Sequence, residues 1–324
     1  RLVPLILDVV RRRAPAATSA IDMFSGSARV GYALKGAGLK VAANDHNAYA
    51  HTLARCYVEC DDDLVQKIER VLAELRRVKP RAGWFTSTFC EQARFFHPKN
   101  GARIEAMRNR IARMELDRKL EAAVTVSLME AADRVDSTVG VQMAYLKSWA
   151  PRAHNDIELR TPKLLPRAQA GRGKAHQLDA AIAARKLAAD VAYLDPPYNQ
   201  HSYLRNYHIW ETLVLWDKPD VYGLAKKRVD CRERSSAFNL KRDALAAFDD
   251  VVTHVDAKLL VVSFNDEGFL DRATIESILA KRGVVDVIEV ESARYVGARI
   301  GIYSPRGEKV GSVSHLTKKE LLYL

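Results

Sequence analysis

The sequence predicts an α/β protein with a doubly wound, mostly parallel sheet. Two parts of the chain alternate short apolar strands with helices, and this alternation is typical of a parallel sheet that is covered on both faces. Between them lies a basic, mainly helical segment that lacks this alternation. The predicted strands span 19–24, 39–43, 190–194, 258–264, 284–289 and 299–303, and 299–307 are expected to form a terminal hairpin. The predicted helices span 30–35, 49–57, 64–78, 178–188 and 271–281.

Residues 81–174 differ from both flanks in charge and periodicity. They hold 17 Lys and Arg against 10 Asp and Glu, which gives +7 of the net +11 of the whole chain. Apolar residues between 104 and 114 recur at spacings of 3, 4 and 3, which predicts an amphipathic helix, and a second helix is expected over 118–134. Residues 151–174, rich in Pro, Gly and basic side chains, are expected to form a mobile loop. We therefore expect an inserted domain at 81–174, with 1–80 and 175–324 forming one domain around it.

Composition narrows the class of protein. The 324 residues are 48% hydrophobic and 28% charged, which excludes a largely disordered chain. No apolar run approaches the roughly 18 residues of a membrane span, and no signal-peptide segment opens the sequence. The net charge favours a polyanionic partner, either nucleic acid or an anionic membrane surface, and a basic enzyme without such a partner remains an alternative. Four cysteines favour a reducing compartment, and Cys56 and Cys60 have no second pair that would complete a metal site.

The first strand–loop–helix predicts a cofactor site. Gly26, Ala28 and Gly31 match the dinucleotide fingerprint, except that Ala occupies the position where a Gly admits a pyrophosphate. Asp45 ends the next strand, where an acid can bind ribose hydroxyls, and Asp22 can accept a hydrogen bond from a cationic amine. A nucleoside with an amine and no phosphate fits these groups, as in S-adenosylmethionine. The alternative is an ordinary tight turn.

Asp195-Pro196-Pro197-Tyr198 follows a buried strand and is the most specific motif. The carboxylate lies at the ligand edge of the sheet, and the two prolines fix the backbone around a carbonyl group. A carboxylate and a carbonyl that each accept one N–H would orient the lone pair of an exocyclic amine toward a methyl donor. The flat face of Tyr198 can stack on a base that has left the duplex. A strand end with a packed tyrosine is the structural alternative.

This motif and the upstream glycine loop resemble the D12-type (Dam-like) S-adenosylmethionine-dependent DNA adenine-N6 methyltransferases. The resemblance implies a Rossmann-like sheet of seven strands, six parallel and one reversed near the C-terminus. It implies that Phe24-Ser25-Gly26 and Asp45 bind the cofactor, that Asp179 contacts its adenine, and that residues 81–174 recognise the target. Ala28 departs from the family, which often has Gly there. The resemblance also implies a Gly-x-x-Lys-like cofactor segment just before Arg1, followed by a helix over 2–10.

The resemblance also implies duplex DNA as the partner, a possible cognate restriction endonuclease, and action in the bacterial cytoplasm at the nucleoid. An aromatic and amide-rich stretch follows the motif through Tyr207 and enters a helix with Trp210 and Trp216. Such side chains, like basic ones, are typical of DNA contacts, although most of this stretch is expected to be packing. The expected DNA-binding residues are Arg152, Arg160, Lys163, Arg167, Arg172, Lys174, Asn199, His201 and Tyr203. Residues 263–268 resemble a family loop that borders the base pocket, or form a simple turn. Lys226 to Arg228 could contact phosphates, although such runs are usually solvated.

The predicted function is therefore methyl transfer from S-adenosylmethionine to adenine N6 in duplex DNA with base flipping. Cytosine-N4 methylation is an alternative because its pocket uses the same amine chemistry. A DNA-binding subunit without turnover is a second alternative, and an RNA or protein methyltransferase is a third. In the third class, Asn usually precedes the Pro-Pro-Tyr.

Overall fold

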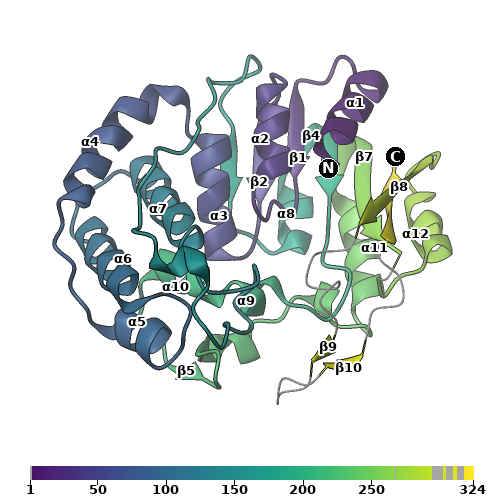
Figure 1. The fold of residues 1–324 in the computed structure, drawn as a ribbon. Helices are drawn as coiled ribbons and strands as arrows, with labels where there is room; N and C mark the ends of the chain where they lie inside the picture. The colour runs from purple at the N-terminus through teal and green to yellow at the C-terminus, as the bar shows by residue number, and fades with distance from the viewer. Residues whose placement is uncertain (1, 267, 294–301, 304–308, 312–316) are drawn as a thin grey trace.

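A seven-stranded sheet forms the centre of the protein in the computed structural model, which describes residues 2–266, 268–293, 302–303, 309–311 and 317–324. The strand order is β3-β2-β1-β4-β7-β11-β8 (Figure 1). The strands are β1 Ser19–Asp22, β2 Lys40–Asn44, β3 Lys174–His176, β4 Ala188–Leu194, β7 Asp256–Asn265, β8 Val287–Ala293 and β11 Thr317–Tyr323.

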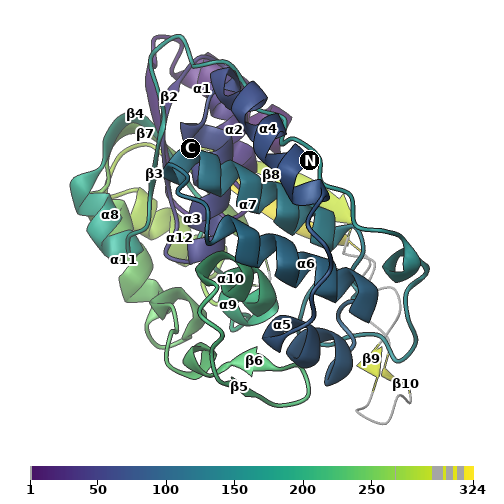
Figure 2. The ribbon, with the colours of Figure 1, turned by 90° about the vertical axis from the view of Figure 1, so that its left-hand side faces the viewer.

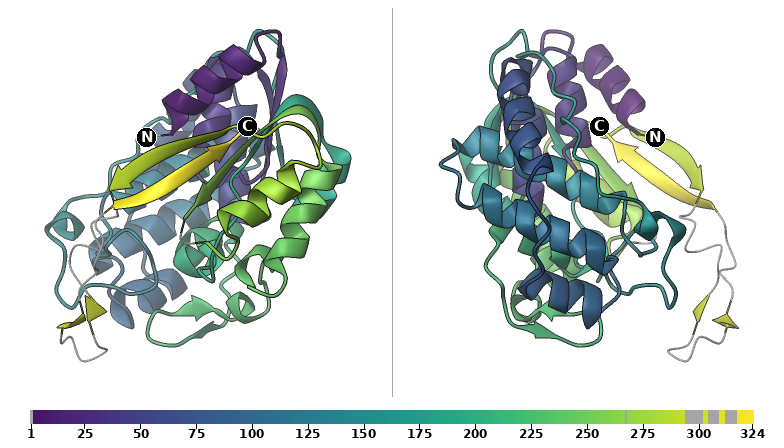
Figure 3. Two further views of the ribbon diagram at one scale, coloured as in Figure 1. Left: turned by 90° about the vertical axis from the view of Figure 1, so that its right-hand side faces the viewer. Right: turned by 60° about the vertical axis from the view of Figure 1, so that its left-hand side comes forward.

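One strand of this sheet is reversed. β3, β2, β1, β4 and β7 pair in parallel, whereas β11 pairs antiparallel with β7 on one side and β8 on the other. β8 therefore runs in the direction of the first five strands. Figure 3 shows β8 and β11 side by side at the edge of the molecule near both chain ends. The expected sheet, with six parallel strands and one reversed near the C-terminus, is confirmed.

Helices cover both faces of the sheet. Successive residues of each strand point to opposite faces, so neighbouring residues of β1 pack in different cores. Ala20 packs in a core with α1 (Val3–Arg13) and α2 (Arg29–Gly36). Its neighbour Ile21 packs in a second core with α8 (Ala180–Lys186), α11 (Ala244–His254) and α12 (Arg272–Leu279). This is the doubly wound arrangement that the sequence predicts.

A helical half lies beside the sheet and has one core of its own (Figure 2). Leu72 and Leu75 of α4 and Ile209 of α10 pack in the same core as Phe89 and Leu128. The core thus extends across the expected boundary at 80/81 and includes a helix that follows the Asp195 motif. Its main helices are α3 Ala48–Ala54, α4 Val65–Arg76, α5 Trp84–Thr86, α6 Pro98–Ile111, α7 Arg118–Asp133 and α10 His208–Leu215.

The segment 151–174 is only partly the loop that its composition predicts. It begins with a 3-10 turn at Pro151–His154 and ends in the edge strand β3, which the sequence pattern missed. Between them the chain has neither helix nor strand, but Leu159 and Leu164 are buried against the helical core. The predicted loop is therefore confirmed between these two elements, and its leucines and several arginines are held by the rest of the protein.

Several elements after residue 200 were not predicted. They are α9 (Tyr203–Asn206), the hairpin β5 (Val221–Tyr222) and β6 (Lys227–Arg228), α11, and strand β11. Of the predicted strand at 299–303, Ile302–Tyr303 forms β9 and pairs with β10 (Lys309–Gly311), whereas 299–301 and the predicted hairpin residues 304–307 lie outside the described residues. No helix in the described part of the chain is both long and apolar enough to cross a membrane.

Candidate active site

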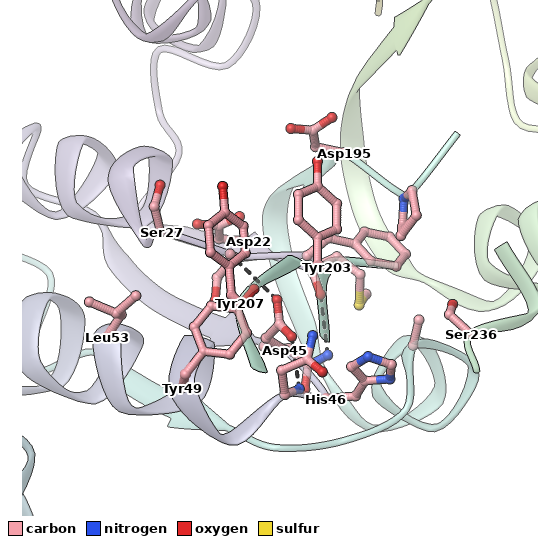
Figure 4. Close-up of a pocket in the computed structure, with 18 of the residues that line it drawn as sticks. Asp22, Ser27, Asp45, His46, Tyr49, Leu53, Asp195, Tyr203, Tyr207 and Ser236 are labelled. Carbon is pink, nitrogen blue, oxygen red and sulfur yellow. Dashed lines mark hydrogen bonds between the residues drawn. The ribbon is translucent and has the colours of Figure 1, made fainter. Parts of the chain in front are cut away.

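A cavity of about 820 Å³ lies at the carboxyl edge of the sheet. Three carboxylates from the ends of β1, β2 and β4 line it, namely Asp22, Asp45 and Asp195 (Figure 4). The predicted cofactor half and the predicted catalytic motif therefore open onto one space. Of the predicted site residues, the lining contains Asp22, Phe24, Ser25, Gly26, Asp45, Asp179, Asp195, Pro197 and Tyr203, and it does not contain Ala28, Pro196, Tyr198, Asn199, His201 or the six basic residues.

The glycine loop is held by backbone hydrogen bonds and by Asp45. Gly26 and Ala28 both have a left-handed backbone, with φ of +48° and +60°. The Gly26 N–H donates to Asp45 Oδ2 at 3.0 Å, and the Asn47 N–H donates to Asp45 Oδ1 at 2.9 Å. Burial raises the pKa of Asp45, and these two donors oppose the rise. Each carboxylate oxygen has a second lone pair, so Asp45 can hold the loop and still accept a hydroxyl.

Asp22 lies under the first turn of α2. Its side chain is buried, and Oδ2 accepts a hydrogen bond from the Gly31 N–H at 2.8 Å. Oδ1 has no hydrogen-bond partner among the described residues. Burial raises the pKa of Asp22 to about 7; the Gly31 hydrogen bond opposes this shift, and the charges of Asp195 and Asp45 add to it. A cationic amine in the cavity would satisfy this carboxylate.

Gly31 is required by the close approach of α2 to β1. A Cβ at this position would lie 2.9 Å from Asp22 Oδ2 and 3.0 Å from Val58 Cγ2. The third position of the fingerprint therefore has the packing role that its glycine predicts.

The Asp195 motif follows the buried carboxyl half of β4. Val191 to Leu194 are buried, and the Met23 N–H donates to the Tyr193 carbonyl at 3.0 Å, which ties the starts of the two functional loops together. Asp195 itself is exposed toward the cavity.

Tyr198 is supported from the neighbouring loop after β7. Its carbonyl accepts a hydrogen bond from the Phe269 N–H at 2.8 Å, and a Cβ on Gly268 would lie 3.2 Å from Tyr198 Cβ. The ring packs partly buried against the α8–α11–α12 core. Gly268 of the stretch 263–268 therefore contacts the motif, and the described residues of that stretch do not line the cavity. Stacking of Tyr198 on a base remains a prediction.

Aromatic side chains form one wall of the cavity. The rings of Tyr203 and Tyr207 are nearly parallel, with centroids 6.5 Å apart, and Tyr49 lies 5.8 Å from Tyr207. The aromatic stretch after the motif gave a signal for Tyr207 and Trp210. Nothing in the sequence indicated Tyr49 or the residues that α7 contributes, which are Met129, Glu130 and Asp133.

Asn44 is a further residue that sequence reasoning missed. Its side-chain Nδ2 donates to the carbonyls of Met23 and Leu178 at 3.2 Å each, and Oδ1 accepts from the Leu178 N–H at 3.1 Å. Asn44 thus joins the glycine loop to the segment that carries Asp179. Asp179 caps α8 by accepting from the Ala181 N–H at 2.9 Å.

Each of the four predicted DNA-binding arginines has an ion-pair partner within the protein. Arg167 and Arg172 both bind Asp61, which also pairs with the buried Lys35 at 3.0 Å. The chain around them packs beside Gly38 and Lys40 at the amino end of β2, at the opposite edge from the cavity. Arg152 pairs with Asp136 and Arg160 with Glu158, whereas Lys163 and Lys174 are exposed.

The run from Lys226 to Arg228 is only partly solvated. Arg228 is buried and pairs with Asp217 at 2.7 Å and with Asp230 at 3.0 Å.

The sequence was compared with known proteins. The model of the family described as D12 class N6 adenine-specific DNA methyltransferase matches residues 1–278. Type II methyltransferase M.NlaIII from Neisseria lactamica is 28% identical over 284 residues, which cover 85% of this chain and 83% of that protein. Type II methyltransferase M.CviAII from Paramecium bursaria Chlorella virus 1 is 24% identical, with coverage of 89% and 87%.

A third relative is longer. Type II methyltransferase M.FokI from Planomicrobium okeanokoites is 32% identical over 210 residues, which cover 64% of this chain and 32% of M.FokI. The family match covers both the glycine loop and the Asp195 motif, whose ends meet in the cavity. The chain belongs to the D12 class of N6 adenine-specific DNA methyltransferases.

Proposed function

We propose that this chain transfers the methyl group of S-adenosylmethionine to N6 of an adenine that is flipped out of duplex DNA. The observation that carries the proposal is the single cavity shared by the ends of β1, β2 and β4. Asp22 and Asp45 offer acceptors for an ammonium and a ribose, and Asp195 stands at the adjoining strand end. A methyl donor and an amine acceptor bound at these two places would face one another.

In the proposed reaction, Asp195 and the Pro196 carbonyl each accept one N–H of the adenine amine. This arrangement favours sp³ character at N6 and holds its lone pair in line with the methyl carbon. The carbon–sulfur bond breaks as the carbon–nitrogen bond forms, and the proton released from N6 passes to Asp195. The rate gain would come mainly from alignment, which can contribute about 7–11 kcal/mol in well-oriented reactions.

The proposed DNA face is the carboxyl edge around the cavity. Tyr203, Tyr207 and Tyr49 offer flat faces for an extruded base, and Asn199 and His201 lie just after the motif. Target recognition is assigned to residues 81–174 within the larger helical half. We propose that Arg167 and Arg172 lie outside this face, because both bind Asp61 at the opposite edge of the sheet.

The names of the relatives support a proposal for the biological role of this chain. Because they are type II methyltransferases, we propose that this chain modifies one site in bacterial DNA, in the cytoplasm, and protects that site from a cognate restriction endonuclease.

Methyl transfer to duplex DNA tests the reaction. Wild-type protein is expected to transfer tritiated methyl groups, and Asp195→Ala is expected to lose at least about 100-fold in rate because the amine loses its acceptor. Asp256→Ala is the matched control, since Asp256 is an exposed acid at the amino end of β7. Equal labelling by wild type and Asp195→Ala would refute the assignment. Methylation-sensitive sequencing of DNA from expressing cells would identify the base and the site, and N4-methylcytosine there would refute the choice of adenine.

A further inference from the structure

A short segment after the β5–β6 hairpin lies between the two functional loops. Residues 236–239 line the cavity, and Ala237–Asn239 forms a 3-10 turn held by the Asn239 N–H, which donates to the Ser236 carbonyl at 2.9 Å. Phe238 is buried, and its ring meets the Phe24 ring edge-on, with centroids 5.1 Å apart. One side of this segment thus packs on the cofactor loop.

The other side of the segment holds the chain that leaves the Asp195 motif. Asn239 Nδ2 donates to the Asn199 carbonyl at 2.8 Å and lies 3.3 Å from the His201 carbonyl. Two carbonyl acceptors require the amide nitrogen of Asn239 at this position. The Asn199 side chain in turn accepts from the His201 N–H at 3.0 Å, so the chain at 199–201 is fixed from two directions.

This region of the chain needs such support. Residues 195–202 form neither helix nor strand, so no regular hydrogen-bond ladder holds the motif after β4 ends. The Phe269 N–H holds Tyr198 from the β7 side, and Asn239 holds the next residues from the cavity side. Loss of the second support would leave the chain free to move between Tyr198 and Ser202, where α9 is capped.

We infer that Asn239 is a positioning residue for methyl transfer, which acts by fixing the backbone that follows Asp195–Tyr198 and, through Phe238 against Phe24, by linking it to the cofactor loop. This inference rests on the proposed function. It implies an effect on the chemical step, because a small displacement of aligned reacting groups lowers the rate by up to about 100-fold without loss of binding.

Single-turnover methylation at saturating DNA and S-adenosylmethionine tests this inference. Asn239→Ala and Asn239→Asp both remove the donated hydrogen bonds, and each is expected to slow the step by about 10- to 100-fold. The dissociation constants for DNA and cofactor are expected to change by less than about threefold, because Asn239 contributes no charge to either ligand. Asn239→Gln retains the amide donor and is expected to recover part of the rate.

Arg282 provides a control outside the insert and the cavity lining. Its Nη1 also bridges two backbone carbonyls, those of Val252 at 2.6 Å and Val255 at 3.0 Å. Arg282→Ala is expected to lower the melting temperature, while its saturated single-turnover rate, measured well below that temperature, stays within about twofold of wild type.

Three outcomes would overturn the inference: a wild-type rate in Asn239→Ala, a rate in Asn239→Gln as low as in Asn239→Ala, or a rate loss in all Asn239 variants that disappears when the assay is cooled, as expected for simple destabilisation. An inactive wild-type protein would instead refute the proposed function itself.

Discussion

Asp22 is a buried carboxylate whose charge is unfavourable until a ligand arrives. Its pKa is raised from an ordinary 3.8 to about 7, chiefly by burial, so the folded free protein retains a proton between these values that the unfolded chain releases. A proton held only by the folded state makes stability fall as pH rises through this window. Binding of a cationic amine would require the ionised form and would therefore release that proton.

We accordingly predict that S-adenosylmethionine binds more tightly as pH rises from 5.5 to 7, with a limiting change of about tenfold per pH unit. Isothermal titration calorimetry in buffers of different ionisation enthalpy measures both the affinity and the released proton. Asp22→Asn should bind weakly and independently of pH over the same range. A wild-type affinity that does not vary with pH would contradict the proposed pairing of Asp22 with the amine.

At the scale of elements, α2 depends on β1 for the cap of its first turn. The N-cap residue Ala28 has no side chain that can accept a hydrogen bond, and Asp22 accepts from the Gly31 N–H in its place. This arrangement fixes the helix, the glycine loop and the buried carboxylate as one unit. This unit therefore requires both a residue without a Cβ at position 31 and the carboxylate of Asp22.

Gly31→Ala is predicted to destabilise the protein by about 1–3 kcal/mol and to weaken cofactor binding, because the added methyl group overlaps Asp22 and Val58. Urea unfolding and cofactor titration measure the two effects. Gly283→Ala is the control, since a Cβ there meets nothing within 4 Å, and its stability should stay within about 0.5 kcal/mol of wild type. A Gly31→Ala variant as stable as this control would contradict the proposed contact.

The return segment to β3 is held by a buried ion cluster. Asp61 and Lys35 are both buried, and Arg167 and Arg172 complete the cluster from the segment. Burial would raise the pKa of Asp61, but the hydrogen bonds from Lys35 and Arg172 outweigh it and lower the pKa below 3.8. The stabilisation is therefore present above pH 4 and is lost as pH falls through the lowered value.

Asp61→Asn is predicted to cost about 3–5 kcal/mol at neutral pH, because it leaves the Lys35 charge buried without a carboxylate. Arg172→Gln should cost less, since Lys35 and Arg167 still balance Asp61. Denaturant unfolding measures both, and fluorescence anisotropy with labelled duplex DNA should show wild-type affinity for Arg172→Gln. A loss of DNA affinity without a loss of stability in that variant would indicate that Arg172 contacts DNA.

At the scale of the whole molecule, the net charge of +11 predicts that the binding of DNA depends on salt concentration and that the binding of the cofactor does not. The logarithm of DNA affinity should fall linearly with the logarithm of salt concentration, by about 0.9 for each phosphate neutralised. Cofactor affinity should change little over the same range, because its proposed contacts are short and buried. Salt titrations with duplex DNA and with S-adenosylmethionine measure the two slopes, and a flat DNA slope would contradict a phosphate-binding role for the positive charge.

Sequence predicted the parts of this molecule that local chemistry determines. The apolar run before Asp195 and the glycines near Asp22 specify a strand end and a tight loop, and the family resemblance supplied their order. The sequence analysis missed β11, because that strand begins with Thr, Lys and Lys and its position in the sheet depends on pairing with β7 and β8. The sequence analysis did not foresee the ion pairs of Arg167 and Arg172, because their partner Asp61 lies 106 and 111 residues away.

Under the proposal that residues 81–174 recognise the target, the shared core of the helical half restricts how a new target site could be acquired. Residues from α4, from the insert and from α10 interdigitate, so exchange of 81–174 alone between relatives would join side chains that never packed together. A chimera that also carries α4 and α10 would keep these contacts intact. New specificity in this lineage would then arise more readily by substitution on exposed loops than by recombination at the edges of the insert.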